Sequence, residues 1–431
     1  MASRSEDDAS ASDHRPWWRR PIRIHPGAEA MTWAAVAAGA AFRLLAYASN
    51  RSLYRDEASL LQNLVRLDVF DFHTTLTEYQ LAPPAFLAIE RILVRLPGNV
   101  VLTARALPLV FGIASIFLFR IVGRRFLTRG AVPIAVGLFA LSDWLIYYSS
   151  EIKQYSCDLA LTLAALLLAT GPPVDGCLPI RRLVAMAAFG VVGFWFSYPI
   201  VFVLAGVGVY LFTTAIVRRD RRALVTLPVI GLLWVVSFGA CYLVSHRMLD
   251  QGRFIWDWWD FAFLRIPPHS INELKLECWQ LLNVFDSPSD VKTPLGPVAT
   301  AFLALILAIV GVVAIGRRWP GGLFLMTAPF ALVTAASALR QYPFHGRLLI
   351  FLVPMVQMLV AQGAATLGRV GGPRFAIVMG VFLLIQPASD AVWHQFVRPL
   401  YHDGFDSHGD LRPDLLDEVG AENVELGRSR R

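Results

Sequence analysis

Two adjacent carboxylates stand out as groups that could do chemistry in this chain of 431 residues. They are Asp56 and Glu57, and they come a few residues after the first long apolar run. Adjacent residues on a helix point about 100° apart, so the two cannot act as a matched acid and base on one substrate atom. One of them could face a cavity while the other caps or orients. The alternative is that Asp56 is the N-cap of a helix beginning at Glu57, a role that Asp fills well.

A second polar segment, residues 149–158, carries Glu151, Lys153, Tyr155 and Asp158. Glu151, Tyr155 and Asp158 are spaced four and three residues apart, so on a helix they would share one face. Ionisable groups near hydrocarbon are costly and usually face a partner or an aqueous cavity, which favours a site inside a helix bundle. The alternative is a surface turn in which Lys153 pairs with Glu151.

A third segment, residues 340–347, ends on Arg347. A planar guanidinium binds oxyanions such as phosphate through two parallel hydrogen bonds, so Arg347 is a candidate phosphate ligand. The alternative is that it snorkels to lipid headgroups. Arg43, Arg55 and Arg105 likewise lie where membrane topology gives no reason for a positive charge. Several arginines and a few carboxylates around one cavity are what a lipid-phosphate substrate would require.

The elements that position these segments are membrane helices. Hydrophobic residues make up 56% of the chain and charged residues 16%, whereas a soluble domain is nearer half apolar and a quarter charged. This composition excludes an ordinary soluble protein and a disordered chain, and four Cys are too few for a disulfide scaffold. The formal charge of +7 comes almost wholly from arginines clustered between apolar runs, which indicates topology signals rather than nucleic-acid binding.

The sequence predicts an all-α polytopic fold with about 11 transmembrane helices, since a crossing takes about 20 apolar residues. The apolar runs lie near residues 31–48, 101–119, 131–148, 157–170, 183–197, 200–217, 224–244, 295–315, 323–339, 348–367 and 375–386. The segment 82–96 opens with paired prolines, contains Glu90 and Arg91 and is short for a crossing, so we expect an interfacial or re-entrant helix there. The predicted regions are a cytoplasmic basic tail (1–30), a transmembrane domain (31–388) and a short periplasmic tail (389–431).

One orientation fits the charges of every loop. If the N-terminus is cytoplasmic, the cytoplasmic loops hold fourteen arginines and two acids, and the opposite loops hold most of the remaining acids. The three polar segments then lie on the non-cytoplasmic face, together with the large outer loops 49–100 and 245–294. Arginine dominance and short loops indicate a multi-pass protein of a bacterial inner (plasma) membrane whose site faces the periplasm.

The outer loop 245–294 interleaves Trp256, Trp258, Trp259 and Trp279 with charged residues. This pattern predicts one or two amphipathic helices in the membrane interface. They could be a simple aromatic anchor, a lid over the donor or a platform for the acceptor. His269 has no second His or Cys at ligand spacing, so we predict no metal or other cofactor; a divalent ion is compatible with the sequence but not indicated by it.

Five motifs, taken in order, resemble the GT-C superfamily of polyprenyl-phosphate-sugar-dependent glycosyltransferases. They are YRDEASL (54–60), QLAPPAFLAIERIL (80–93), TARALPLVFGIASIFLFRIVGRRF (103–126), YYSSEIKQYSCDLAL (147–161) and QYPFHGRLLIFLVP (341–354). The chain is most similar to family 39, which holds the protein O-mannosyltransferases and the aminoarabinose transferases of lipid A. Relatives often place His before the paired prolines, where this chain has Ala82; Gln80 is the nearby polar residue that could replace it. Relatives also commonly continue into a folded outer domain, and residues 402–420 resemble the start of one.

The resemblance implies an inverting transfer of a sugar from a polyprenyl-phosphate donor to a lipid, glycan or protein acceptor, with Asp56 as general base. Lipid phosphate is a good leaving group, so cations must stabilise it while one carboxylate takes the acceptor proton. Glu57 is the second residue of the catalytic pair. The predicted substrate-binding residues are Arg55, Arg105, Glu151, Lys153, Tyr155, Tyr342 and Arg347.

Two other functional classes compete with this prediction. A lipid or solute transporter or flippase would have a similar number of helices, but should show internal repeats and charges scattered at mid-membrane depth. A polysaccharide ligase using lipid-diphosphate donors would also have a site on one face, but would depend more on Arg and His in a large late loop. The transferase prediction requires Asp56, Glu151 and Arg347, far apart in sequence, to converge in space.

Overall fold

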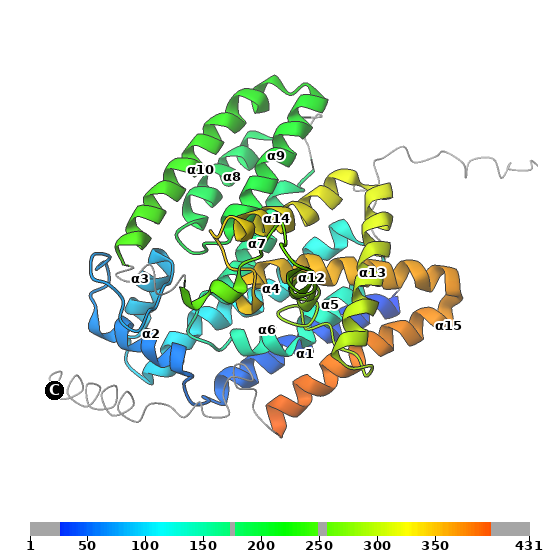
Figure 1. The fold of residues 1–431 in the computed structure, drawn as a ribbon, viewed down its shortest axis with the longest axis horizontal. Coiled ribbons are helices and arrows are strands. Elements are labelled where there is room, and N and C mark those ends of the chain that lie inside the picture. The colour runs from blue at the N-terminus through cyan, green and yellow to red at the C-terminus, as the bar shows by residue number, and fades with distance from the viewer. Residues whose placement is uncertain (1–25, 173–176, 249–256, 398–431) are drawn as a thin grey trace, which may run out of the picture.

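The computed structural model describes residues 26–172, 177–248 and 257–397, and the regular structure of that part is helical (Figure 1). The prediction of an all-α polytopic membrane protein is confirmed. The helices in chain order are α1 (Pro26–Ala48), α2 (Arg55–Arg66), α3 (Pro84–Leu93), α4 (Val100–Phe126), α5 (Ala131–Leu141), α6 (Asp143–Tyr148), α7 (Tyr155–Ala169), α8 (Ile180–Gly193), α9 (Ile200–Arg218), α10 (Arg221–Arg247), η3 (Asp260–Ala262), α12 (Ile271–Asn283), α13 (Pro297–Arg318), α14 (Pro320–Ala338), η4 (Gly346–Leu352) and α15 (Val353–Phe396).

Every predicted apolar run is helical, but the runs are not eleven separate long helices. Within the described ranges, seven helical stretches are long and apolar enough to cross a membrane, namely α1, α4, α9, α10, α13, α14 and the continuous η4–α15 stretch. The run 131–148 is divided by Ser142, whose side chain caps α6. The runs 348–367 and 375–386 lie in the continuous η4–α15 stretch, which bends at Gly372, where φ is +87°. Glycine adopts this backbone region without steric cost, which explains the bend.

The segment predicted not to cross is α3, a helix of ten residues. At 1.5 Å per residue it is about 15 Å long, half the thickness of a bilayer core. It packs with α2 through a small apolar core that includes Leu60, Leu64, Phe86 and Leu87. Ile152, from the turn before α7, belongs to the same core, so α2 and α3 are fastened to that turn.

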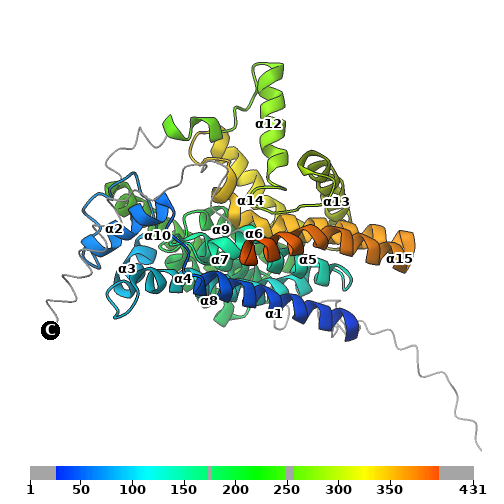
Figure 2. The same cartoon turned by 90° about the horizontal axis from the view of Figure 1, so that it is seen from below.

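The helices are arranged in two groups, and α7 and α14 contact both of them (Figure 1). One group contains α8, α9 and α10, and in the other α5 packs against both α1 and α15, with α13 along α15. Helices α2 and α3 lie together at one end of the molecule (Figure 2). The first outer loop, the turn before α7 and the segment before η4 therefore come from helix ends that the topology prediction places on one face.

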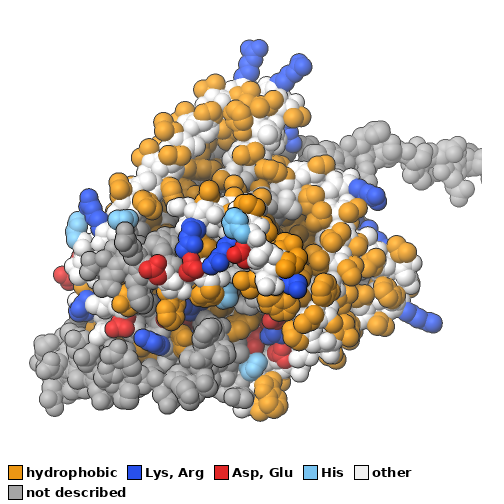
Figure 3. All heavy atoms as spheres, viewed as in Figure 1, with side chains coloured by type: hydrophobic (Ala, Val, Ile, Leu, Met, Phe, Trp, Pro, Cys, Tyr) orange, Lys and Arg blue, Asp and Glu red, His pale blue; other side chains and the backbone are white. Residues whose placement is uncertain are grey.

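The long outer loop contains a helix that stands away from the body. Figure 2 shows α12 projecting from the rest of the chain, and Trp279 on it is exposed, as is Trp258 before it. In Figure 3 most of the surface in view is apolar, and charged side chains gather near its centre. This is the pattern expected of an interfacial element beside a membrane-embedded surface. Trp256 lies outside the described residues, as do the predicted cytoplasmic tail up to residue 25 and the predicted periplasmic tail from residue 398.

Candidate active site

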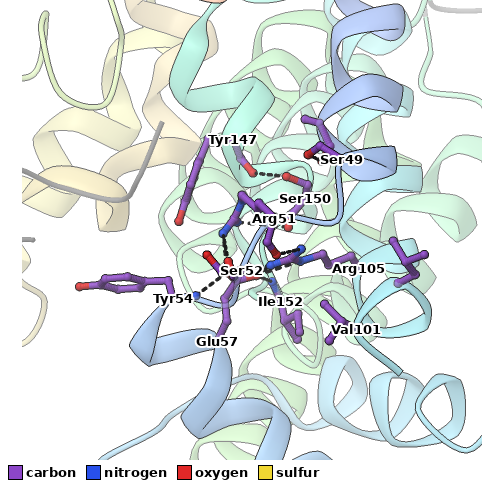
Figure 4. A network of polar contacts seen from close by, with 12 residues as sticks. Ser49, Arg51, Ser52, Tyr54, Glu57, Val101, Arg105, Tyr147, Ser150 and Ile152 are labelled. Atoms are coloured by element: carbon purple, nitrogen blue, oxygen red, sulfur yellow. Dashed lines mark hydrogen bonds and ion pairs between the residues drawn. The ribbon is translucent and has the colours of Figure 1, made fainter. Parts of the chain in front are cut away.

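Glu57 is the centre of a buried network that joins three separate parts of the chain. Its side chain is fully buried and accepts hydrogen bonds from Arg51 Nη1 at 2.7 Å and Arg105 Nη2 at 3.1 Å (Figure 4). It also accepts backbone N–H groups of Tyr54 at 3.1 Å and Ile152 at 3.0 Å. Burial alone would raise the pKa of Glu57, but the two guanidinium groups and the backbone donors lower it below its usual range. Glu57 is therefore ionised, and its ion pairs and hydrogen bonds link α2, α4 and the turn before α7.

Asp56 faces a different partner. Its Oδ2 lies 2.5 Å from Nη2 of Arg347, which follows it by 291 residues, and its side chain is 27% exposed. The prediction that the two carboxylates point to different surroundings is confirmed. The N-cap alternative for Asp56 is wrong, because α2 begins at Arg55 with Tyr54 as its N-cap. Asp56 thus lies in the first turn of α2 and is partly open to solvent.

The turn 149–154 brings Glu151 and Lys153 to this pair. Helix α7 begins at Tyr155, so the predicted helix face shared by Glu151, Tyr155 and Asp158 is wrong for Glu151. The surface-turn alternative is also wrong, because Glu151 is fully buried and Lys153 is 5% exposed. The turn packs closely on α4 at Gly112, where an added Cβ would lie 2.5 Å from Cβ of Ser149. Only glycine permits this approach, which a sequence pattern does not reveal.

Lys153 lies among the charges of this site. Its ammonium donates a hydrogen bond to Oε1 of Gln80 at 2.5 Å. Burial lowers the pKa of Lys153. The nearby charges of Asp56 and Glu151 raise this pKa and partly offset the effect of burial, while the charge of Arg347 lowers it further. Arg347 contacts both Asp56 and Tyr155, the second residue after Lys153, so the three predicted segments converge.

Arg347 is aimed into the site by the segment 342–348. Gly346 has φ of +44°, and the 3-10 helix η4 begins there. The guanidinium carbon of Arg347 lies 5.8 Å from the ring centre of Tyr155, in addition to the contact with Asp56. The hydroxyl of Tyr342 donates to the carbonyl of Leu348 at 2.9 Å, so it closes this segment. Arg347 therefore contacts an acid and an aromatic ring, and the snorkelling alternative does not describe it.

The remaining off-topology arginines differ in their surroundings. Arg105 is fully buried, and besides Glu57 it donates to the carbonyl of Arg51 at 2.8 Å. Arg43 is also fully buried and donates to the carbonyls of Gly39 at 3.0 Å and Ala140 at 2.9 Å. Arg55 is exposed. Of the four, Arg347 is the one that meets Asp56.

Two residues that contact the site, Arg51 and Gln80, were not among the predicted site residues. Arg51 completes the network around Glu57, and Gln80 holds Lys153. Gln80 stood out in the sequence only as the polar neighbour of the paired prolines. Arg51 lies in the same predicted outer loop as Arg55, and its charge on that side was the signal that could have found it. Among the residues that the structure describes, no three His, Cys, Asp or Glu side chains gather as a set of metal ligands.

The charges of the site do not cancel. Four cations, Arg51, Arg105, Lys153 and Arg347, surround three carboxylates, Asp56, Glu57 and Glu151. When all are ionised the formal net charge is +1. A partly exposed carboxylate beside surplus positive charge can accept a proton while the cations hold an oxyanion.

The fold resembles that of two solved membrane enzymes. The oligosaccharyltransferase of Archaeoglobus fulgidus, in complex with Zn and sulfate, superposes with a TM-score of 0.51 at 11% identity over 85% of this chain and 53% of its own. ArnT from Cupriavidus metallidurans, bound to undecaprenyl phosphate, gives 0.52 at 17% identity over 86% of this chain and 66% of its own. Its apo state gives 0.50 at 16% identity.

The predicted fold is confirmed, because the chain shares the fold of this oligosaccharyltransferase and of ArnT. This chain spans between about half and two thirds of the length of these structures. No protein-family model matches the sequence, and no curated protein matches it.

Proposed function

We propose that this chain, which has the GT-C fold, is an integral membrane glycosyltransferase that moves a sugar from a polyprenyl-phosphate donor to an acceptor hydroxyl or amine. The observation that carries the proposal is the contact of 2.5 Å between Asp56 and Arg347, with Lys153 and Glu151 beside it. These groups come from three segments that are far apart in the sequence and come together at this contact.

The chemistry is a single displacement at the anomeric carbon. The acceptor oxygen or nitrogen forms a bond to this carbon, and the bond from the carbon to the donor phosphate oxygen breaks with its electron pair. Asp56 takes the proton that the acceptor loses, a contribution of about 10²- to 10⁴-fold in rate. Arg347 and Lys153 stabilise the departing lipid phosphate. Attack opposite the leaving group inverts the anomeric centre.

An apolar cavity beside the site suits the carrier's hydrocarbon tail. It has a volume of about 720 Å³ and lies between α14, α15 and the C-terminal end of α12. Its lining includes Phe285, Ala308, Phe330 and Phe344. Phe344 is three residues before Arg347, so one short segment would contact both the tail and the phosphate. The undecaprenyl phosphate bound to ArnT supports a carrier of this class.

The other charged and aromatic residues position the reacting groups. Glu57, with Arg51 and Arg105, fixes the start of α2 and hence the direction of Asp56. Glu151 adds negative charge that keeps the surrounding cations ionised. The ring of Tyr155 borders Arg347, and Tyr342 holds the segment that carries Arg347 through its hydrogen bond to the Leu348 carbonyl.

We place the site on the non-cytoplasmic face of a bacterial inner membrane. The fourteen arginines of the opposite loops support this orientation through the positive-inside rule. The site residues gather at one end of the helices, which favours a transferase over a transporter, whose binding residues lie near mid-membrane.

Asp56→Asn tests the proposal. In a strain that lacks this chain, the variant should restore neither the modified lipid nor the modified glycan that mass spectrometry detects with the wild type, because an amide does not accept the proton. In membranes the rate should fall by about 10²- to 10⁴-fold. Asp68→Asn is the matched control, since the Asp68 side chain is fully exposed in the same loop. Sugar transfer by the Asp56 variant at the wild-type rate would refute the assignment.

A further inference from the structure

Lys153 is a buried cation whose hydrogen-bond partner is neutral. Its Nζ lies 2.5 Å from Oε1 of Gln80, and both residues are less than a tenth exposed. Among residues 26–172, 177–248 and 257–397 no carboxylate lies within salt-bridge distance of this ammonium. Asp56 and Glu151 influence it from further away. Gln80 therefore orients the ammonium without neutralising it, and within the described residues no ion pair neutralises it either.

The side-chain amide of Gln80 has one possible orientation. Its Nε2 donates to the carbonyl of Glu78 at 3.1 Å, so Oε1 must face Lys153. Glu78 and Tyr79 have φ values of 57° and 55°, a left-handed conformation that non-glycine residues adopt at a cost and mainly where function requires it. Two strained residues in succession thus turn the chain so that Gln80 points inward.

The Gln80 segment is anchored to the same helix that carries Asp56. The backbone N–H of Thr77 donates to Oδ1 of Asn63 at 2.9 Å, and the Gln80 N–H donates to the Thr77 carbonyl at 3.4 Å. Asn63 is fully buried and belongs to α2. One helix therefore sets the place of Asp56 directly and the place of Lys153 through Asn63, Thr77 and Gln80.

We propose that Gln80 is a positioning residue for the donor phosphate, holding the Lys153 ammonium toward the Asp56–Arg347 pair without neutralising it. This inference rests on the proposed function. The inference explains why the group that accepts the Lys153 hydrogen bond is an amide. A carboxylate at residue 80 would form an ion pair with Lys153 and reduce the formal charge of the site from +1 to zero. An apolar side chain there would remove the hydrogen-bond acceptor that Gln80 offers to the ammonium, so the ammonium could turn away.

The test measures the binding of undecaprenyl phosphate to the purified full chain, together with donor KM and kcat in membranes. Gln80→Glu should weaken binding and raise donor KM by about ten- to hundredfold, the range for a hydrogen bond to a charged group. Gln80→Met, which keeps the length but lacks the acceptor, should raise donor KM several-fold. It should also move the alkaline loss of binding to lower pH, because Lys153 would then lose its proton more easily. Acceptor KM should stay unchanged in both variants, and Gln341→Glu, an exposed glutamine, should bind as the wild type does.

The outcomes separate this inference from the proposed function. If the wild type and Arg347→Ala bind undecaprenyl phosphate equally well, or neither binds it, the proposed function fails. If the wild type binds, Lys153→Met binds weakly, and Gln80→Glu and Gln80→Met bind as the wild type does, the role of Gln80 is refuted. A fall in kcat and thermal stability together, with donor KM and the pH profile unmoved, would assign Gln80 a structural role and also overturn the inference.

Discussion

Replacing Glu57 with Gln should destabilise the fold far more than replacing its neighbour Asp56 with Asn. Glu57 is fully buried and accepts from two guanidinium groups and two backbone N–H groups. A glutamine has one acceptor oxygen and a donor NH₂ group, which would face donors. Removing one partner of a buried charge network costs about 3–5 kcal/mol, because the remaining charges stay buried without compensation. Asp56 is 27% exposed and its ion pair with Arg347 is open to solvent, so after solvent screening the substitution should cost about 1 kcal/mol or less.

The assay is thermal unfolding of the detergent-solubilised chain for the wild type, Glu57→Gln and Asp56→Asn. The pKa of Glu57 is lowered in the folded state, so its stabilisation is fully present above the ordinary glutamate pKa of 4.5. That stabilisation is lost as the pH falls through the lowered folded-state pKa. The gap in unfolding temperature between the wild type and Glu57→Gln should therefore be widest near neutral pH and narrow below pH 4.5. Equal unfolding temperatures for the two variants would refute the conclusion that Glu57 stabilises the fold by linking α2, α4 and the turn before α7.

The remaining predictions concern the cations and metal dependence. Arg347→Lys should reduce kcat by about 10- to 100-fold with unchanged folding, because a point charge replaces a planar fork; wild-type turnover would contradict its role at the phosphate. Burial lowers the pKa of Lys153 below its usual 10.5, so donor affinity should decline with rising pH before an ordinary lysine titrates. Lys153→Arg should abolish this decline, and a wild-type pH profile in that variant would exclude Lys153 as its cause. Activity should survive treatment with EDTA, and its loss and recovery with a divalent ion would show that the chain uses a metal.

Much of the architecture could be predicted from local sequence patterns. Long apolar runs become helices because the backbone must satisfy its own hydrogen bonds inside a bilayer. The paired prolines and the charges Glu90 and Arg91 likewise indicated the short helix α3. The breaks were less visible: Ser142 divides one run, and Gly372 joins two runs into a bent helix. Both depend on one residue's backbone conformation, which hydrophobicity does not encode.

In the candidate site, too, some features could be predicted from local geometry and others depended on tertiary packing. Adjacency on a helix was enough to predict that Asp56 and Glu57 face different surroundings, since that depends only on helix geometry. Which of them meets the open site was decided by Arg105, which fills the space beside Glu57. Glu151 was wrongly assigned to a helix face, because packing on Gly112 buries the turn before α7.

The sequence by itself determined that this is a helical membrane protein, and it predicted that the polar segments lie on one face, because apolar length and loop charge are local properties. Only the tertiary structure decided which carboxylate each arginine meets and how exposed the resulting ion pair is. Arg105 and Arg347 are the same residue type, yet one is enclosed by Glu57 and the other reaches Asp56. Contacts across 291 residues depend on how the helices pack, and no local pattern contains that information.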